Sequence, residues 1–320
     1  MRENPDQAMN SPLISIIMAT YRGSHFLVHS IPSVINQDYK NWELIVVGDG
    51  CADETEQVVN SFGDSRIRFF NLEKNSGQQA TPNNLGMSKA KGQLIAFLNQ
   101  DDLFFPDHLS KSLEEIEKSE ADFLIVPGIK VMSSKKEDFE NGNFQVQLCS
   151  VHPDGRYSTN VFSVASTWFF KRELIEKLGL WKLEQELYIT PSQEWIFRAS
   201  RLGIAFHFPN RVGALVILSG ERKNSYLQKF SHEHDYFSSR LNNLELKNQL
   251  LEKASVFAYK ELQNQLFFRP KILIKRVLGL PLDWILLKLG IHPNAARNRK
   301  AWGKKGNLIK KVRKDTGLEP

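Results

Sequence analysis

"ISIIMATYRGSHFLVHSIPSVINQDYKNWELIVVGDGCADET", residues 14–55, is the stretch that decides the fold. Two apolar runs, at 13–19 and 42–47, are short and rich in β-branched residues, which is typical of buried strands. A helical pattern over 25–37 lies between them. A strand, a helix and a second strand at this spacing predict a βαβ unit whose two strands run parallel.

The same alternation continues toward the C-terminus. Further strands are predicted at 66–72 and 93–98, with a helix over 81–92 between them. The later pattern is less regular: we expect one or two strands in 121–132, a loop-rich segment over 133–160, a strand at 166–170, helices at 171–179 and 192–202, a strand at 204–209 and a long helix over 222–266. The sequence therefore predicts an α/β fold around a mostly parallel central sheet, with a helical extension at the C-terminal end.

A second stretch, "QLIAFLNQDDLFFPDHL" at 93–109, places Asp101 and Asp102 directly after a predicted buried strand. Two like charges side by side in a partly apolar setting repel and lose hydration unless a cation or solvent relieves them. Two explanations fit the pair. One of its members caps the helix that Pro106 helps to open, or the pair binds a cation.

Polar residues follow three of the predicted strands. Thr20 and Tyr21 follow the first strand, Asp49 follows the second, and residues 99–102 follow the fourth. In open α/β sheets, ligands bind beyond the carboxyl ends of the strands. We therefore expect these side chains to meet at one edge of the sheet.

These motifs make the chain resemble the family-two class of inverting glycosyltransferases, which have the GT-A fold, over about residues 12–215. The likeness rests on the 14–55 stretch, including "QDYKNWELIVV", and on the acidic segment at 90–109. The resemblance implies that Thr20 and Tyr21, with Arg22 beside them, bind the nucleotide of a nucleotide-sugar. It also implies that Asp49 accepts a hydrogen bond from the base, commonly uracil.

Asp101 and Asp102 correspond to the family's acidic pair, whose members bind the ribose and a divalent cation, Mn²⁺ or Mg²⁺, on the diphosphate. Such a cation would relieve the repulsion within the pair and stabilise the leaving nucleoside diphosphate. This chain has Asn99 where the family often begins the motif with Asp, which keeps an acceptor but removes a charge.

Inversion by a single displacement needs a carboxylate that takes the proton of the acceptor hydroxyl. Aligned on Arg198, the position where the family commonly places this base falls near Ser192, and the nearest carboxylate is Glu194, which we expect to be the base. The alternative is that Glu194 only forms an i,i+4 ion pair with Arg198. Trp168 and Trp195 could stack on a sugar ring, although aromatic residues at such spacing are also typical of a core.

The charge of the chain is unevenly distributed. Residues 269–320 contain 14 Lys and Arg against 3 Asp and Glu, whereas residues 1–268 contain 28 and 33. With apolar residues between 278 and 287, this tail suits adsorption to an anionic membrane surface. A solvated tail, or a helix packed on the catalytic domain, is the alternative. We expect no nucleic-acid partner, because the body lacks a basic surface with interleaved aromatic residues.

We expect a cytoplasmic protein, which lies on the inner face of the plasma membrane if the tail binds there. The chain has only two cysteines, a polar N-terminus and no apolar stretch long enough to span a membrane. The expected layout is a polar tail (1–11), a GT-A domain (12–220, with a nucleotide-sugar half at 12–120 and an acceptor half at 121–220), a helical extension (221–268) and a basic amphipathic tail (269–320).

The expected activity is metal-dependent, inverting transfer of a sugar from a nucleotide-diphosphate sugar, a UDP-sugar above all, to a glycan or lipid-linked glycan. The expected setting is surface polysaccharide biosynthesis. A catalytically silent nucleotide-sugar-binding or scaffold protein of the same fold is the alternative.

Overall fold

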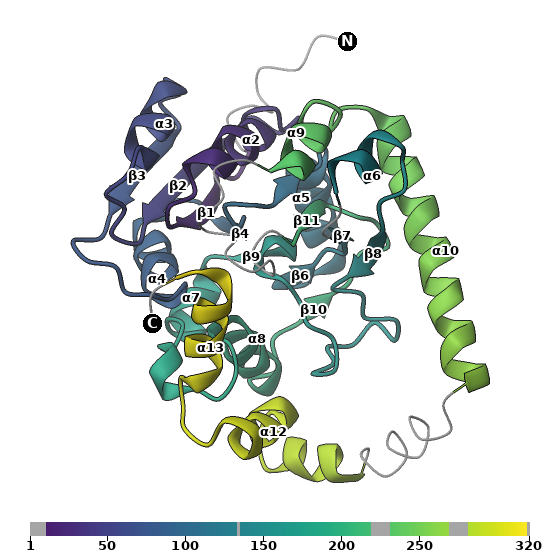
Figure 1. The fold of residues 1–320 in the computed structure, drawn as a ribbon. Helices are drawn as coiled ribbons and strands as arrows, with labels where there is room; N and C mark the ends of the chain where they lie inside the picture. The colour runs from purple at the N-terminus through teal and green to yellow at the C-terminus, as the bar shows by residue number, and fades with distance from the viewer. Residues whose placement is uncertain (1–10, 133–134, 219–230, 269–280, 319–320) are drawn as a thin grey trace.

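The computed structural model describes residues 11–132, 135–218, 231–268 and 281–318, with the side chains of 263–268 left out. Two sheets and the helices that flank them make up the body of the molecule, and the long helix α10 runs down one side of it (Figure 1). The predicted polar segment 1–11 lies outside the described residues except for its last position.

The larger sheet has seven strands in the order β10-β6-β9-β4-β1-β2-β3. Its strands are β1 (Ile14–Thr20), β2 (Trp42–Gly48), β3 (Ile67–Asn71), β4 (Leu94–Phe97), β6 (Phe123–Ile125), β9 (Trp168–Lys171) and β10 (Phe206–His207). β9 is antiparallel to both of its neighbours, and the other pairs are parallel. The prediction of a mostly parallel central sheet is confirmed.

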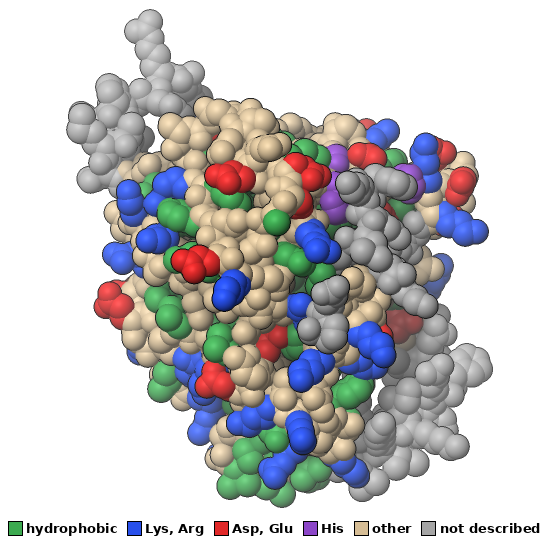
Figure 2. Space-filling view, turned by 60° about the vertical axis from the view of Figure 1, so that its left-hand side comes forward, with side chains coloured by type: hydrophobic (Ala, Val, Ile, Leu, Met, Phe, Trp, Pro, Cys, Tyr) green, Lys and Arg blue, Asp and Glu red, His purple; other side chains and the backbone are tan. Residues whose placement is uncertain are grey.

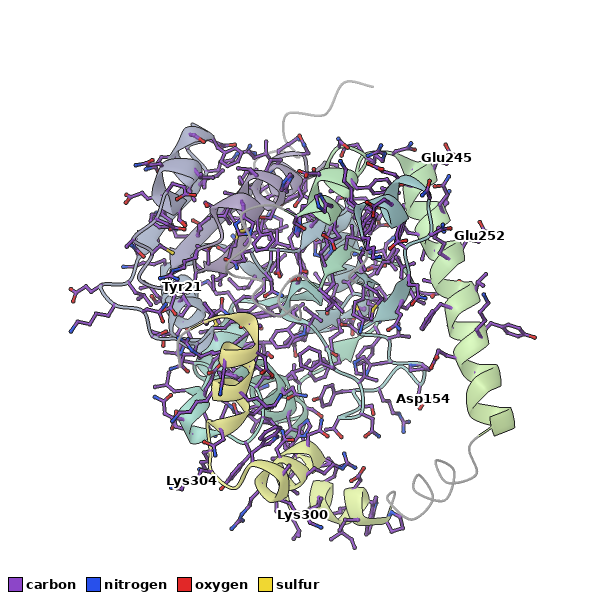
Figure 3. All side chains as sticks on the ribbon, viewed as in Figure 1. Tyr21, Asp154, Glu245, Glu252, Lys300 and Lys304 are labelled. Carbon is purple, nitrogen blue, oxygen red and sulfur yellow. The ribbon has the colours of Figure 1, made fainter. Side chains whose placement is uncertain are left out.

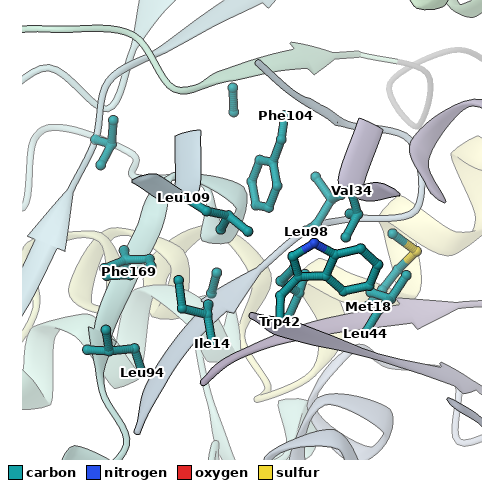
Figure 4. Close-up of a cluster of buried hydrophobic side chains, with 14 of the residues drawn as sticks. Ile14, Met18, Val34, Trp42, Leu44, Leu94, Leu98, Phe104, Leu109 and Phe169 are labelled. Atoms are coloured by element: carbon teal, nitrogen blue, oxygen red, sulfur yellow. The ribbon is translucent and has the colours of Figure 1, made fainter. Parts of the chain in front are cut away.

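The helices that accompany this sheet are α2 (Ser24–Ile35), α3 (Thr55–Ser61), α4 (Ala80–Lys89), α5 (His108–Ser119), α7 (Glu173–Leu178) and α8 (Pro191–Arg201). One core cluster lies between α2, α5 and the sheet, where Met18, Val34, Trp42 and Phe104 pack together (Figure 4). Fully burying an aliphatic or aromatic side chain of this size stabilises the fold by roughly 1.5–3 kcal/mol.

The strand register brings the predicted polar residues to one edge. β1 and β2 pair in parallel from Ile14 opposite Trp42 to Thr20 opposite Gly48. β4 pairs with β1 on the other side, with Phe97 opposite Ile17. The residues that follow these strands therefore leave the sheet on the same side, as expected from the sequence.

The smaller sheet has the order β5-β11-β7-β8. Its strands are β5 (Leu103–Phe104), β11 (Ala214–Ile217), β7 (Gly128–Val131) and β8 (Val146–Cys149), and α6 (Lys136–Glu140), α9 (His232–Ser238) and α10 (Leu244–Phe268) lie close to it. The segment 133–160, expected to be loop-rich, thus contains a short helix and a strand.

The single long helix expected over 222–266 is wrong in its described part, because the chain forms α9 and α10 with a break between them. Phe237 near the end of α9 and Leu241 within the break are both buried against the smaller sheet. The turn therefore lets both side chains reach the same core. Residues 222–230 of that prediction lie outside the described residues.

The C-terminal part returns to the body. Residues 281–288 are helical, followed by α12 (Pro293–Trp302) and α13 (Asn307–Thr316), and α13 lies in front of α7 and α8 (Figure 1). Among the alternatives for the tail, a helix packed on the catalytic domain is what the structure has at 307–316. Across the described residues, no helix is both long and apolar enough to cross a membrane.

Candidate active site

A pocket of about 360 Å³ lies at the carboxyl ends of β1, β2 and β4. Its walls come from the ends of these strands, the start of α8 and the C-terminal helix α13. The residues that line it include Thr20, Tyr21, Asp49, Gly77, Asn99, Gln100, Asp101, Asp102, Phe162, Glu184, Ser192, Val312 and Arg313. The pocket therefore collects most of the nucleotide-binding and metal-binding positions that the sequence suggested.

The end of β1 is tied to the acidic motif by one buried side chain, Gln100. The Thr20 hydroxyl donates to Gln100 Oε1 at 2.7 Å, and the Tyr21 backbone N–H donates to the same oxygen at 3.0 Å. Gly23 is needed here, because a Cβ at this position would collide with Gln100. Arg22 differs from the expectation: it is exposed, it does not line the pocket, and its guanidinium lies 5.3 Å from the Tyr21 ring centroid.

Asp49, expected at the nucleotide base, is buried at the pocket and organises a loop. One carboxylate oxygen accepts hydrogen bonds from the Ser76 N–H (2.8 Å) and hydroxyl (2.7 Å). The other accepts from the Gly77 N–H at 3.0 Å. Gly77 has φ +72°, a left-handed conformation that glycine adopts without strain. Asp49 therefore fixes the 76–77 turn as well as lining the pocket.

Asp101 and Asp102 have different surroundings. The Asp102 carboxylate is 1% exposed and accepts from the Ser166 hydroxyl (2.5 Å), the Asn99 amide (2.9 Å) and the Ile217 N–H (3.1 Å). Burial, and secondly the charge of Asp101, raise the pKa of Asp102 above its ordinary value, and the three donors oppose this shift. Asp101 is half-buried and lines the pocket.

His234, on α9, holds the acidic motif in place, and sequence reasoning missed it. Its Nε2 lies 2.7 Å from the Asp101 carbonyl oxygen and its Nδ1 lies 2.8 Å from the Ser231 hydroxyl. Burial lowers the pKa of His234 to about 3, so the ring is neutral, and its Nε2–H donates to the Asp101 carbonyl. No local pattern links His234 to a motif 133 residues earlier.

Glu194, which was expected to be the catalytic base, does not line the pocket. Its carboxylate is paired with Arg198 Nη2 at 2.5 Å and with Lys182 Nζ at 3.0 Å. Arg198 also donates to the Leu180 carbonyl at 3.1 Å, so the pair fastens α8 to the preceding loop. The structure thus has the ion pair that was the alternative. Ser192, at the family's usual base position, does line the pocket.

Trp168 and Trp195 are both fully buried, which corrects the expectation that they stack on a sugar. Their rings stack on each other with centroids 5.9 Å apart, and Trp195 Nε1 donates to the Gly179 carbonyl at 2.8 Å. They belong to the core between the larger sheet and α8. Besides Tyr21, the pocket is lined by the aromatic side chain of Phe162, which is 51% exposed.

Glu184 is a pocket carboxylate that no motif in the sequence indicated. It begins the short 3₁₀ helix Glu184–Glu186, and its N–H donates to Gln78 Oε1 at 2.8 Å. Burial raises the pKa of Glu184 to about 8; Arg313 lowers it and Asp49 raises it further. Glu184 therefore takes up and releases its proton near neutral pH.

Within the described ranges, no group of three or more His, Cys, Asp or Glu side chains is arranged to hold a metal ion. A cation at this site would need oxygen atoms from a bound donor as well as from the protein, and Asp101 lines the pocket where such a donor would bind.

Comparisons with known proteins agree with this geometry. Residues 15–179 match the family described as Glycosyl transferase family 2. A relative from Escherichia coli, UDP-Glc:alpha-D-GlcNAc-diphosphoundecaprenol beta-1,3-glucosyltransferase WfgD, is 37% identical over 116 residues, which is 36% of this chain and 46% of that protein.

Two solved structures are similar in fold. TarS 1–349 of S. aureus in complex with UDP-GlcNAc is 17% identical with a TM-score of 0.54, covering 81% of this chain and 76% of that one. The mannosyltransferase PcManGT from Pyrobaculum calidifontis, in complex with GDP-Man and Mn²⁺, is 15% identical with a TM-score of 0.50, covering 95% and 87%.

Proposed function

Because this chain belongs to glycosyl transferase family 2, we propose that it transfers a sugar, with inversion, from a UDP-sugar to a glycan or lipid-linked glycan acceptor during surface polysaccharide assembly. The E. coli relative supports the donor and acceptor classes, since its name specifies UDP-Glc and a GlcNAc-diphosphoundecaprenol. The S. aureus protein of similar fold was crystallised with UDP-GlcNAc, which also favours a uridine donor.

One observation carries the proposal: Thr20, Asp49 and Asp101, which are far apart in the sequence, line one pocket at the carboxyl edge of the sheet. Ligands of open α/β sheets bind at this edge. The pocket volume, about 360 Å³, falls in the range of small-molecule sites.

We include a divalent cation, Mn²⁺ or Mg²⁺, in the proposal. The residues present fit it, because the adjacent carboxyl groups of Asp101 and Asp102 line the pocket and supply the oxygen atoms that such a cation prefers. Asp101 would be the protein ligand, and Asp102, already holding three donors, would fix the motif. When bound, the cation offsets negative charge on the leaving diphosphate. The P. calidifontis structure contains Mn²⁺.

We assign the general base to Glu184 in place of Glu194. Of the acidic residues that line the pocket, Asp49 and the acidic pair are assigned to the donor, which leaves Glu184. A base works best when its pKa lies near the working pH, and burial brings the pKa of Glu184 to about 8. Phe162, exposed at the pocket, would contact a sugar ring of the donor or acceptor.

Release of UDP from a panel of UDP-sugars, in the presence of Mn²⁺, tests the proposed activity. We expect turnover by the wild type and its loss in Asp101→Ala, whereas Asp154→Ala, which removes an exposed carboxylate that does not line the pocket (Figure 3), should match the wild type. If the wild type binds UDP but hydrolyses or transfers no UDP-sugar faster than Asp101→Ala does, the protein would be the catalytically silent binding protein.

We also propose that the 281–291 segment rests on an anionic membrane surface, where a lipid-linked acceptor would lie. Leu282, Trp284 and Leu289 are exposed by 58%, 61% and 68%. Lys288 Nζ lies 5.5 Å from the Trp284 ring centroid. Figure 2 shows hydrophobic side chains gathered at the lower end of the molecule with Lys and Arg around them. An apolar face edged by cations suits the interface of anionic lipids.

Co-sedimentation with phosphatidylglycerol-containing vesicles tests this placement. The double variant Trp284→Ala, Leu289→Ala should shift the protein from the pellet to the supernatant, because it removes apolar area that would enter the lipid interface. Leu244→Ala is the matched control, since this side chain is 71% exposed on a different helix. Equal partitioning of the double variant and the wild type would rule out the segment as the membrane contact.

A further inference from the structure

The C-terminal helix α13 forms one wall of the pocket. Ile309, Val312, Arg313 and Thr316 all line it, together with Leu318 just after the helix end. Val312 is 47% exposed although it faces the pocket, so this apolar side chain is turned toward a cavity that a ligand can fill. An exposed apolar group next to a concave site is typical of a ligand contact.

The tail is anchored to the segment that precedes α8. The Gly306 N–H, at the start of α13, donates to the Leu187 carbonyl at 3.0 Å. On α12, the Asn298 amide donates to the Tyr188 carbonyl at 2.8 Å. Two adjacent carbonyls thus hold two successive tail helices, so α13 has a defined seat on the catalytic domain.

The same segment contacts the loop that Asp49 organises. Gln78 accepts from the Glu184 N–H at 2.8 Å and its amide lies 3.3 Å from Gln185 Oε1. The Arg313 guanidinium packs on Gly77, where an added Cβ would collide with it. The Asp49 turn therefore contacts both the 184–185 segment and α13.

Arg313 brings a positive charge to a group of carboxylates. It opposes the rise in the pKa of Glu184, to which Asp49 contributes. Its placement on Gly77, whose N–H donates to Asp49, puts the guanidinium beside the turn that lines the pocket. The other basic residues of α13 differ: Lys310, Lys311 and Lys314 are exposed and do not line the pocket.

We propose that α13 is a part of the donor site, in which Val312 and Arg313 contact the bound nucleotide-sugar. This inference rests on the proposed function, because it takes the pocket ligand to be a nucleoside diphosphate sugar. The tail then has two faces with separate roles: an apolar face with Arg313 toward the donor and a lysine face toward solvent.

Calorimetric titration of the full-length protein with UDP and Mn²⁺ tests the inference. We expect Arg313→Ala and Val312→Asp each to weaken UDP binding about tenfold, because each removes a contact or places a carboxylate beside an anionic ligand. Lys314→Ala, which removes the same charge from the exposed face of the same helix, should bind like the wild type. Neither test residue is buried, and circular dichroism verifies that each variant is folded.

Hydrogen exchange provides a second readout, in which UDP should slow exchange of the 307–316 amides in the wild type and not in Val312→Asp. The inference is overturned if both variants bind UDP like the wild type and α13 exchange is unchanged by UDP. It is also overturned if the variants bind UDP more tightly, which would make α13 a plug. If the wild type binds neither UDP nor another nucleoside diphosphate, the proposed function fails, and this inference with it.

Discussion

Asp102→Ala is predicted to destabilise the protein strongly, because it removes the acceptor of three buried or half-buried donors. The Ser166 hydroxyl, the Asn99 amide and the Ile217 N–H all donate to this carboxylate. A buried donor left without a partner costs about 1–3 kcal/mol. Relief of the repulsion from Asp101 and reorientation of the Ser166 hydroxyl offset part of the sum, which leaves a loss of about 2–5 kcal/mol in unfolding free energy.

Urea unfolding followed by tryptophan fluorescence measures this loss. Asp101→Ala is the control, because its side chain is half-buried and a substitution there should cost less than about 1 kcal/mol while abolishing metal-dependent turnover. We therefore expect Asp102→Ala to lower the stability of the fold and Asp101→Ala to abolish turnover without a large loss of stability. A midpoint for Asp102→Ala equal to that of the wild type, or one above that of Asp101→Ala, would refute the structural role of Asp102.

Three further predictions concern single side chains. Glu184→Gln should lower kcat at least about a hundredfold, whereas Glu194→Gln should not. The wild-type rate should rise with pH up to about 8, where Glu184 becomes deprotonated. Equal kcat values for Glu184→Gln and the wild type would show that Glu184 is not the base. Trp195→Ala should lower the unfolding free energy by about 3–5 kcal/mol, because Trp195 is fully buried. Phe162→Ala should leave the unfolding free energy nearly unchanged and raise the KM for acceptor or donor. A stable Trp195→Ala protein together with a destabilised Phe162→Ala protein would contradict the placement of Trp195 in the core and of Phe162 at the pocket. His234→Ala should lower the unfolding free energy by about 1–3 kcal/mol and weaken Mn²⁺-dependent UDP binding. If neither the stability nor the UDP affinity changes, His234 does not position the acidic motif.

The pKa of Glu184 also fixes the sign of a stability change. Because burial raises this pKa in the folded protein, the folded state binds more protons than the unfolded state between pH of about 4.5 and about 8. Stability from this group is therefore fully present at low pH and is lost as the pH rises toward about 8. Glu184→Gln should flatten this dependence.

Local patterns predicted the sheet and the donor edge of the site. The β-branched runs that became β1 and β2 are short and bounded by polar turns, so their type and order could be determined without tertiary information. Parallel strands deliver the residues after them to one edge, which is why Thr20, Asp49 and the 99–102 segment were correctly expected to converge.

The acceptor side could not be predicted in the same way. Glu194 and Trp195 are adjacent on α8, and only the packing of that helix decides that one pairs with Arg198 and the other enters the core. Glu184 lies on a single 3₁₀ turn without a motif. In α13 the lysines dominate the composition and obscure the face that lines the pocket, so a helix packed on the catalytic domain was one of three alternatives for the tail, and its place at the pocket was not predicted.

Calorimetric titration of the wild type with UDP, with Mn²⁺ and then after its removal by EDTA, tests the central claim most directly. That claim is that Thr20, Asp49 and Asp101 surround one metal-bound nucleoside diphosphate. We predict saturable binding of one UDP per chain with Mn²⁺ and affinity at least about tenfold weaker after EDTA, because the cation links Asp101 to the diphosphate. Binding of the same strength in both conditions would contradict the role of the cation, and the absence of binding in both would contradict the site itself.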